Sequence, residues 1–239
     1  RCFLEGPYDA NTGLMHDSLR VQGLVPLTEP YTALGFTQVG GGGESVASAV
    51  LNTTGNSAIV DQVLLELRDK NDPTVILSTR CALVQRDGDV VDMDGSSPVT
   101  FARTGDQYYL AVRHRNHLGA MTANAIALSN APVPIDFTAP TTSTYGTNAT
   151  KSVNAVQVLW AGNTVRDGAL KYTGSGNDRD AILVEVGGST PNNTAIGYAV
   201  ADVTMDGIIK YTGAGNDRDP ILVNVGSTTP NSTRTEQLP

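Results

Sequence analysis

Acidic residues and glycines recur at fixed positions in the last third of this sequence. The segment from Asp167 to Leu183 returns 39 residues later as the segment from Asp206 to Leu222, and most positions are identical. Such self-similarity marks an internal duplication. Clustered oxygen-bearing side chains in glycine-containing loops are the ligands that a hard divalent cation prefers. The repeat therefore predicts two cation-binding loops.

The second copy opens with Asp202-Val-Thr-Met-Asp206-Gly207, which is the start of an EF-hand-type calcium loop. In such a loop, oxygens at positions 1, 3 and 5 converge on one cation, and glycine at position 6 permits a sharp turn. Position 12 is Gly213 here instead of a carboxylate, and the next acids follow only at Asp217 and Asp219. We therefore expect calcium loops that are longer than an EF-hand loop.

The two loops differ in their expected ligands. The second copy offers oxygen-bearing side chains from Asp202, Thr204, Asp206, Asp217 and Asp219, and the first offers those of Asn163, Asp167, Asp178 and Asp180. Position 3 of the first copy is Val165, which has no side-chain ligand. Because calcium affinity follows the charge and number of ligands, the second site is predicted to bind more tightly. The alternative is a metal-free pair of Asp-Gly turns whose Asp-Arg-Asp triplets form surface ion pairs.

A short helix is expected to follow each loop. Asn177 and Asn216 are good N-cap residues, and the acids behind them suit a helix N-terminus. The helices are predicted to run through residues 182–184 and their counterparts and to stop near Gly187 and Gly226. Pro220 falls in the first turn, where proline is tolerated.

The rest of the chain has the pattern of a β protein. Apolar-rich strand candidates are separated by turn residues throughout residues 1–135; they lie at 2–4, 58–68, 75–85, 89–92, 99–101, 107–114 and 121–128. This spacing predicts a mainly β chain with an Ig-like or jelly-roll-like β-sandwich at residues 1–135. A Thr- and Ser-rich linker is expected at 136–150, followed by the duplicated loop-and-helix region at 151–239.

The densest polar cluster of the β region is Arg113-His114-Arg115-Asn116-His117. Arg113, His114, Arg115 and His117 are candidates for binding a carboxylate or a sugar, and the two histidines for holding a metal. The alternative, which we favour, is a strand end that enters a hydrogen-bonded loop.

The cysteine count leaves two alternatives open. Cys2 and Cys81 are the only cysteines. They form either one disulfide, in an oxidising compartment, or two buried thiols.

Composition excludes several classes of function. Sixteen Lys and Arg residues against 24 Asp and Glu give a net charge of −8, which argues against nucleic acid as a partner. No apolar run is long enough to span a membrane. The motifs of serine hydrolases, zinc proteases and phosphate-binding loops are absent, and we expect no enzymatic activity. The opening Arg1-Cys2-Phe3-Leu4 has the pattern of a strand, and we infer a piece of a longer precursor.

Several stretches resemble the C-terminal region of large secreted proteins of Bacteroidetes-type bacteria, of the hemagglutinin or adhesin kind. They include Phe3-Leu-Glu-Gly-Pro-Tyr8 with Gly13-Leu-Met15, Val63-Leu-Leu-Glu-Leu-Arg-Asp69, Gln85-Arg-Asp-Gly-Asp-Val-Val-Asp92, Val112-Arg-His-Arg-Asn-His-Leu-Gly119 and both Tyr-Thr-Gly-x-Gly-Asn-Asp-Arg-Asp copies. The duplicated loops are also similar to dockerin repeats, although their late acids depart from that pattern. The resemblance implies an extracellular or cell-surface location.

Together these features predict a non-enzymatic structural or adhesive protein that calcium stabilises. Its expected partner is a further copy of itself, joined head to tail in a filament, or another surface protein. The alternative is a glycan-binding module, for which Tyr108, Tyr109 and the Arg-His cluster would form the site. With aromatic residues at only 5% of the chain, a broad stacking surface for sugars is not expected.

Overall fold

The computed structural model describes residues 1–239, and strands dominate it. A six-stranded antiparallel sheet has the order β5-β4-β3-β6-β7, and β8 also pairs with β6. Its strands are β3 (Ile59–Asp69), β4 (Ile76–Gln85), β5 (Val90–Val91), β6 (Asp106–Arg113), β7 (Ala120–Met121) and β8 (Ile126–Leu128). Four two-stranded antiparallel sheets accompany it. The prediction of a mainly β chain is confirmed.

The remaining elements are short. Before the main sheet come β1 (Tyr8–Asp9), β2 (Leu14–Met15), α1 (Ser18–Val21) and the 3-10 turns Val50–Asn52 and Gly55–Ser57. After it come β9 (Thr150–Val153), β10 (Val156–Leu159), β11 (Ala169–Lys171), α2 (Asp178–Glu185), β12 (Thr194–Ile196), β13 (Ile208–Lys210), α3 (Arg218–Val225) and β14 (Thr233–Thr235). None of these helices is long and apolar enough to cross a membrane.

Both faces of the main sheet are covered, which explains why β3 is buried along almost its whole length. On one face, Val63 and Leu65 share a core with Val158 and Leu159 of the β9–β10 hairpin. On the other face, Leu64 packs with Tyr31, among residues that precede β3. Alternate side chains of a strand point to opposite faces, so a continuous apolar run is what a doubly covered strand requires.

The segment expected to be a linker packs on the sheet. Phe137 belongs to the larger core, and Thr138 and Ala149 are buried as well. Thr144 pairs with Thr122, and the Tyr145 N–H donates to the Met121 carbonyl. The β9–β10 hairpin then completes the covering layer. Residues 1–160 thus form what we call the sheet layer, whereas the sequence placed the boundary at 135.

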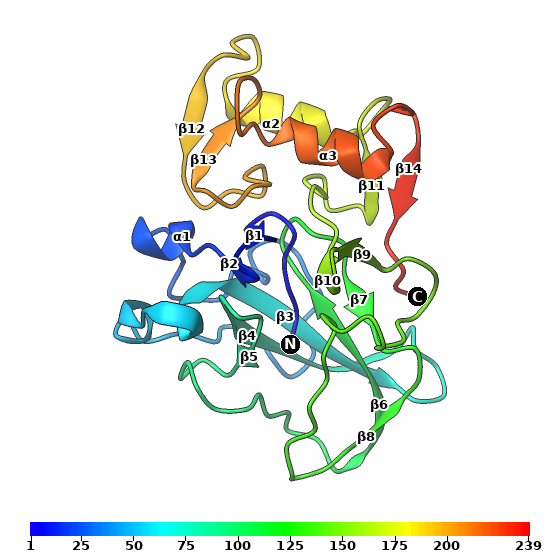
Figure 1. Cartoon of the computed structure of the whole chain (residues 1–239). Coiled ribbons are helices and arrows are strands. Elements are labelled where there is room, and N and C mark those ends of the chain that lie inside the picture. The colour runs from blue at the N-terminus through cyan, green and yellow to red at the C-terminus, as the bar shows by residue number, and fades with distance from the viewer.

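Residues 161–239, here the repeat layer, lie against one end of the sheet layer, with α2 and α3 side by side (Figure 1). The two repeats are interlocked. Strand β12, which follows α2, pairs with β13 of the second loop, and β14, which follows α3, pairs with β11 of the first loop. Each loop is therefore completed by a strand that follows the helix of the other repeat. A separate small core, which includes Ile182, Ile209 and Ile221, fills the space between them.

Beyond β14 the chain returns to the main sheet. The Glu236 N–H donates to the Gly168 carbonyl of the first loop, while its side chain accepts from the Gly119 N–H at 2.6 Å. The same carboxylate pairs with Arg113 at 3.3 Å, and the Arg68 guanidinium donates to the Pro239 carbonyl at 3.1 Å. This tail ties the first loop to β6 and β7.

Candidate metal centre

The second loop forms a tight turn around its first acid. The Gly207 N–H donates to Asp202 Oδ2 at 2.9 Å, and the Ile208 N–H donates to Asp206 Oδ1 at 2.8 Å. Met205 and Gly207 both have positive φ values, 60° and 84°. The left-handed region is strained for a residue such as methionine. The chain therefore bends sharply around the Asp202 carboxylate.

The first loop has nearly the same backbone. Arg166 and Gly168 have φ values of 62° and 74°, and the Ala169 N–H donates to Asp167 Oδ1 at 3.0 Å. One difference concerns the residue that replaces Asp202. Asn163 is buried, and its Oδ1 atom has no hydrogen-bond partner. A buried acceptor without a partner is costly, so this oxygen is free for a ligand.

The first acid of each Asn-Asp-Arg-Asp segment reaches back into its loop. Asp217 is fully buried; its Oδ1 atom accepts from the Val203 N–H at 2.8 Å and the Thr204 N–H at 2.9 Å. Its Oδ2 atom accepts from the Lys210 N–H at 2.8 Å. Asp178 accepts the equivalent bonds from Val165 and Lys171 in the first loop. Both carboxylates hold the two ends of their loop together.

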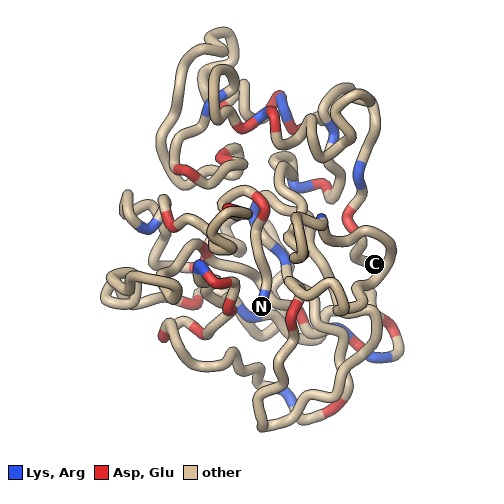
Figure 2. Tube along the Cα trace, in the orientation of Figure 1, with Lys and Arg blue, Asp and Glu red and all other residues tan.

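The second acid of each segment does not join the loop. Asp180 and Asp219 accept from the side-chain amides of Asn177 and Asn216 at 2.8 Å, and each donates its backbone N–H to the same asparagine. Their side chains remain 58% and 57% exposed. Asn177 and Asn216 thus cap the first turns of α2 and α3, as predicted, and Asp180 and Asp219 support these caps. The structure does not bring Asp180 and Asp219 to the predicted calcium ligands. Figure 2 shows the alternating acidic and basic residues at these helix starts.

Negative charge is concentrated in the second loop, and the positive charge of Arg115 offsets it only in part. Burial raises the pKa of Asp202 to about 7; Arg115 opposes this rise, and the nearby carboxylates of Asp217 and Asp206 add to it. Burial also raises the pKa of Asp217, and that of Asp178 in the first loop to about 6. Thr204 Oγ1 lies 3.1 Å from Asp217 Oδ1 and 3.5 Å from Asp202 Oδ1, so three side chains converge.

The convergence is incomplete. No set of three or more His, Cys, Asp or Glu side chains lies close enough together to hold a metal ion. Calcium ligation at this loop would therefore need hydroxyl, carbonyl or water oxygens beside the carboxylates, which are ligands that calcium accepts.

The Arg-His cluster lies at the junction of the two layers and is buried. His114, Arg115, Asn116 and His117 are each at most 2% exposed. The Asn116 side chain donates to the Val200 and Asp202 carbonyls at 3.0 and 2.6 Å, while its own carbonyl accepts from the Gly162 and Asn163 N–H groups. One residue thus touches both loops. A bound sugar does not reach these side chains in this arrangement.

Asp61 is the counter-ion of the cluster. Its Oδ2 atom lies 3.1 Å from both His114 Nε2 and Arg115 Nε, and Tyr198 donates to Oδ1 at 2.7 Å. Burial favours the neutral acid, but the Arg115 charge and the His114 hydrogen bond outweigh it and hold the pKa of Asp61 at about 2. The Arg115 guanidinium also stacks over the Tyr198 ring at 4.3 Å. Sequence reasoning missed Asp61, although an acid near the start of an apolar strand was the available signal.

Arg113 is the one exception in the cluster. It is only partly buried, and it pairs with Glu66 at 3.6 Å and with Glu236 at 3.3 Å. Its role is to hold the C-terminal tail against the main sheet.

The buried histidines predict a pH-dependent stability. Burial lowers the pKa values of His114 and His117, so both stay neutral in the folded chain below the pH at which free histidine protonates. At the histidines the unfolded chain then binds more protons, so their contribution to stability falls as the pH drops below about 6.5. The raised pKa values of Asp202 and Asp178 act in the opposite direction in this pH range, because the folded chain binds more protons there. Each neutral histidine changes the free energy of unfolding by up to about 1.4 kcal/mol per pH unit. Urea unfolding at pH 7.5 and 5.5 measures this slope.

The matched variant is His117→Gln, which removes one of the protonating groups. A drop from pH 7.5 to 5.5 is expected to lower its free energy of unfolding less than that of the unmodified chain, whatever its absolute stability. Equal slopes would show that His117 is not the neutral group that the structure places here.

The two cysteines are free thiols on opposite faces of the main sheet. Cys2 lies in the larger core and Cys81 in the core of the other face. Burial raises the pKa of Cys2 to about 11 and raises that of Cys81 as well. Of the two alternatives, the structure has the pair of buried thiols, because the two side chains belong to separate cores.

A mainly apolar cavity lies away from both loops. It has a volume of about 690 Å³ and lies against the sheet between β3, β6 and the loops around residues 96–105 and 129–137. Its lining is mainly apolar and includes Leu65, Leu110 and Phe101. It shares no residue with either repeat loop.

Comparison with known proteins adds no relative. No protein-family model, curated protein or solved structure matches this chain.

Proposed function

We propose that this chain is a non-enzymatic structural or adhesive module of the cell exterior, and that calcium bound in the second loop stiffens it. The observation that carries the proposal is the meeting of Asp202, Thr204 and Asp217 oxygens in a buried turn whose carboxylates have raised pKa values. A buried carboxylate without a cation is unfavourable. A divalent cation favours its charged form, and calcium accepts this all-oxygen set.

The first loop supports a second, weaker calcium site. Asn163 supplies a neutral oxygen that lacks a partner, where the second loop has a buried carboxylate. Asp167 is also engaged by Lys171 Nζ at 2.8 Å, which competes for its charge. Fewer free charges mean lower calcium affinity. We therefore keep the predicted order of the two sites.

The expected role of calcium is to fix the joint between the layers. The second loop contacts the sheet layer through Asn116 and through Gln22, whose amide donates to the Asp206 carbonyl at 2.6 Å. The approach at Gly6 is so close that a Cβ atom there would lie 2.1 Å from the Val203 carbonyl oxygen. Ordering the loop thus orders the surface on which the layers meet. In this proposal the sheet layer is a β-sandwich variant and the repeat layer is dockerin-like.

Head-to-tail assembly is the proposed use of this rigid module. A contact between unlike ends of identical chains that does not close into a ring produces a filament. The resemblance to secreted adhesin-like proteins supports an extracellular setting and a surface protein as the other partner. No feature of the buried Arg-His cluster favours the glycan-binding alternative.

Electron microscopy with and without EDTA tests the assembly. Purified protein in calcium is expected to form filaments that shorten or disappear in EDTA. Magnesium in place of calcium is the matched control, since its smaller octahedral shell fits a flexible all-oxygen loop less well. Monodisperse single particles under all three conditions would refute assembly and leave calcium binding to be judged by calorimetry.

A further inference from the structure

Three side chains from distant parts of the sequence meet where the two layers join. Lys151 lies on β9, Asn224 on α3, and Glu5 follows the first buried residues of the chain. Lys151 Nζ lies 2.7 Å from Asn224 Oδ1 and donates to Glu5 Oε1. Asn224 Nδ2 donates to Glu5 Oε2 at 2.7 Å. The Glu5 carboxylate therefore bridges the Lys151 amine and the Asn224 amide, and the amine and the amide also contact each other.

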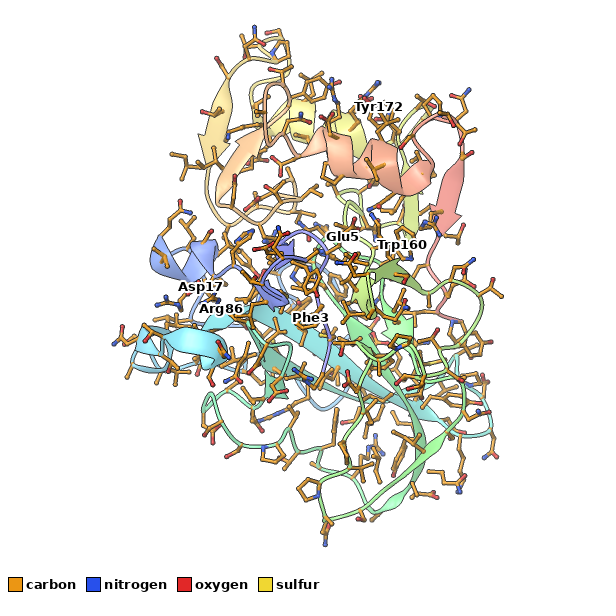
Figure 3. All side chains as sticks on the ribbon, in the orientation of Figure 1. Phe3, Glu5, Asp17, Arg86, Trp160 and Tyr172 are labelled. Atoms are coloured by element: carbon orange, nitrogen blue, oxygen red, sulfur yellow. The ribbon has the colours of Figure 1, made fainter.

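The surroundings hold this arrangement in place. Asn224 is 1% exposed, and its Nδ2 atom also donates to the Ala161 carbonyl at 2.9 Å. Glu5 Oε2 accepts from the Ala161 N–H at 2.9 Å. The Lys151 amine lies over the Trp160 ring, 5.4 Å from its centre. Figure 3 shows Glu5 and Trp160 in the seam between the layers.

Comparison of the two repeats shows that the asparagine at position 224 is specific to the second copy. Helix α2 carries Glu185 at the position of Asn224, although the neighbouring Leu-Val and Val residues are the same in both copies. Helix α3 is the copy whose Asn224 contacts Lys151 of the sheet layer. The amide thus occurs only in the repeat that contacts the lysine.

We propose that Lys151 and Asn224 become joined by an isopeptide bond, with Glu5 as the catalytic acid and base. A lysine amine is a competent nucleophile once it is deprotonated, and a bridging base activates it. Glu5 Oε1 takes a proton from Lys151 Nζ, and the amine lone pair then attacks Asn224 Cγ. Glu5 Oε2 delivers this proton to Asn224 Nδ2, which leaves as ammonia when the Cγ–Nδ2 bond breaks. The second proton lost by the Lys151 nitrogen passes through Glu5 to the ammonia, which departs as ammonium.

The proposed reaction needs no oxidant and no cofactor. The lysine ammonium and the asparagine amide give one secondary amide and one ammonium ion, and the Glu5 carboxylate is regenerated. Holding nucleophile, amide and carboxylate in contact supplies the proximity that a free lysine and asparagine lack. The product ties β9 to α3 covalently across the seam, independently of any calcium.

Intact-mass spectrometry of the folded full chain tests the proposal. The unmodified chain is expected to be lighter than its calculated mass by one ammonia. Glu5→Gln, which loses the base, and Lys151→Arg, which loses the nucleophile but keeps the charge, are each expected to show their full calculated mass. Lys70→Arg is the matched control, because Lys70 pairs with Asp106 at 2.7 Å on the surface and touches no amide. It is expected to lose ammonia like the unmodified chain.

Peptide mapping locates the bond. Trypsin is expected to leave Lys151 uncleaved and to release residues 116–166 joined to residues 219–234. This peptide excludes ammonia loss by succinimide formation at another asparagine. Circular dichroism checks that each variant is folded. A folded chain that keeps its full calculated mass after prolonged incubation at neutral pH overturns the proposal, and a joined peptide in folded Glu5→Gln overturns the role of Glu5.

Discussion

Replacing Asp61 with asparagine is expected to lower the free energy of unfolding by about 3–5 kcal/mol, because it leaves a buried charge without its partner. The substituted amide keeps the size of the side chain and can still accept from Tyr198. It cannot neutralise Arg115, whose side chain is fully buried and whose Nε lies 3.1 Å from the Asp61 carboxylate. One guanidinium nitrogen of Arg115 already lacks a partner. Chemical denaturation of both proteins measures the difference.

The matched control is Asp106→Asn, which breaks the exposed pair with Lys70. Exposed pairs contribute at most about 1 kcal/mol, so this variant is expected to stay close to the unmodified chain. The contrast separates burial from the mere presence of an ion pair. Equal losses in the two variants would contradict the central role of Asp61 at the layer junction.

Local signals in the sequence predicted the repeat helices correctly. Asn177 and Asn216 accept from the backbone N–H three residues later, and Gly226 ends α3 with a φ of 113°. These interactions join residues a few positions apart, so propensity and capping determine them. The long strands β3 and β4 were equally readable, because an apolar run between turn residues specifies them without reference to the rest of the chain.

Long-range contacts were not predicted. The sequence suggested a linker at 136–150 because Thr and Ser are abundant there, yet Phe137 and Ala149 complete the sheet core. No local sequence pattern predicts that β14 pairs with β11, because a three-residue strand gains its stability from its partner. The meeting of Glu5, Lys151 and Asn224 depends on this same packing of the layers.

The candidate site shows the same division. The spacing of acids identified Asp202, Asp206 and Asp217, which the fold gathers around one turn. It also proposed Asp180 and Asp219, which instead lie in the first helical turns and accept from the capping asparagines, where negative charge is favoured by the helix N-terminus. An acid near a loop serves either purpose, and only the three-dimensional position decides between them.

Replacing Asp202 with asparagine is expected to abolish most of the calcium-induced stabilisation. A ligand that binds only the folded chain stabilises it by about 2.7 kcal/mol at 100 times its dissociation constant. The substituted amide can still accept from the Gly207 N–H, which bonds Asp202 at 2.9 Å, but the buried charge at position 1 is lost. Without calcium, the variant is expected to be at least as stable as the unmodified chain, since burial disfavours the Asp202 carboxylate.

Thermal unfolding in calcium and in EDTA measures both effects, and calorimetry counts the sites. Asp94→Asn is the control, because Asp94 closes an exposed turn with Ser96 and Ser97 far from the repeats in sequence, so its calcium response is expected to be unchanged. The reciprocal variant, Asn163→Asp, gives the first loop the charge that it lacks and is expected to tighten its calcium binding. A purely structural Asp202 predicts the opposite pattern, in which Asp202→Asn loses stability equally in calcium and in EDTA.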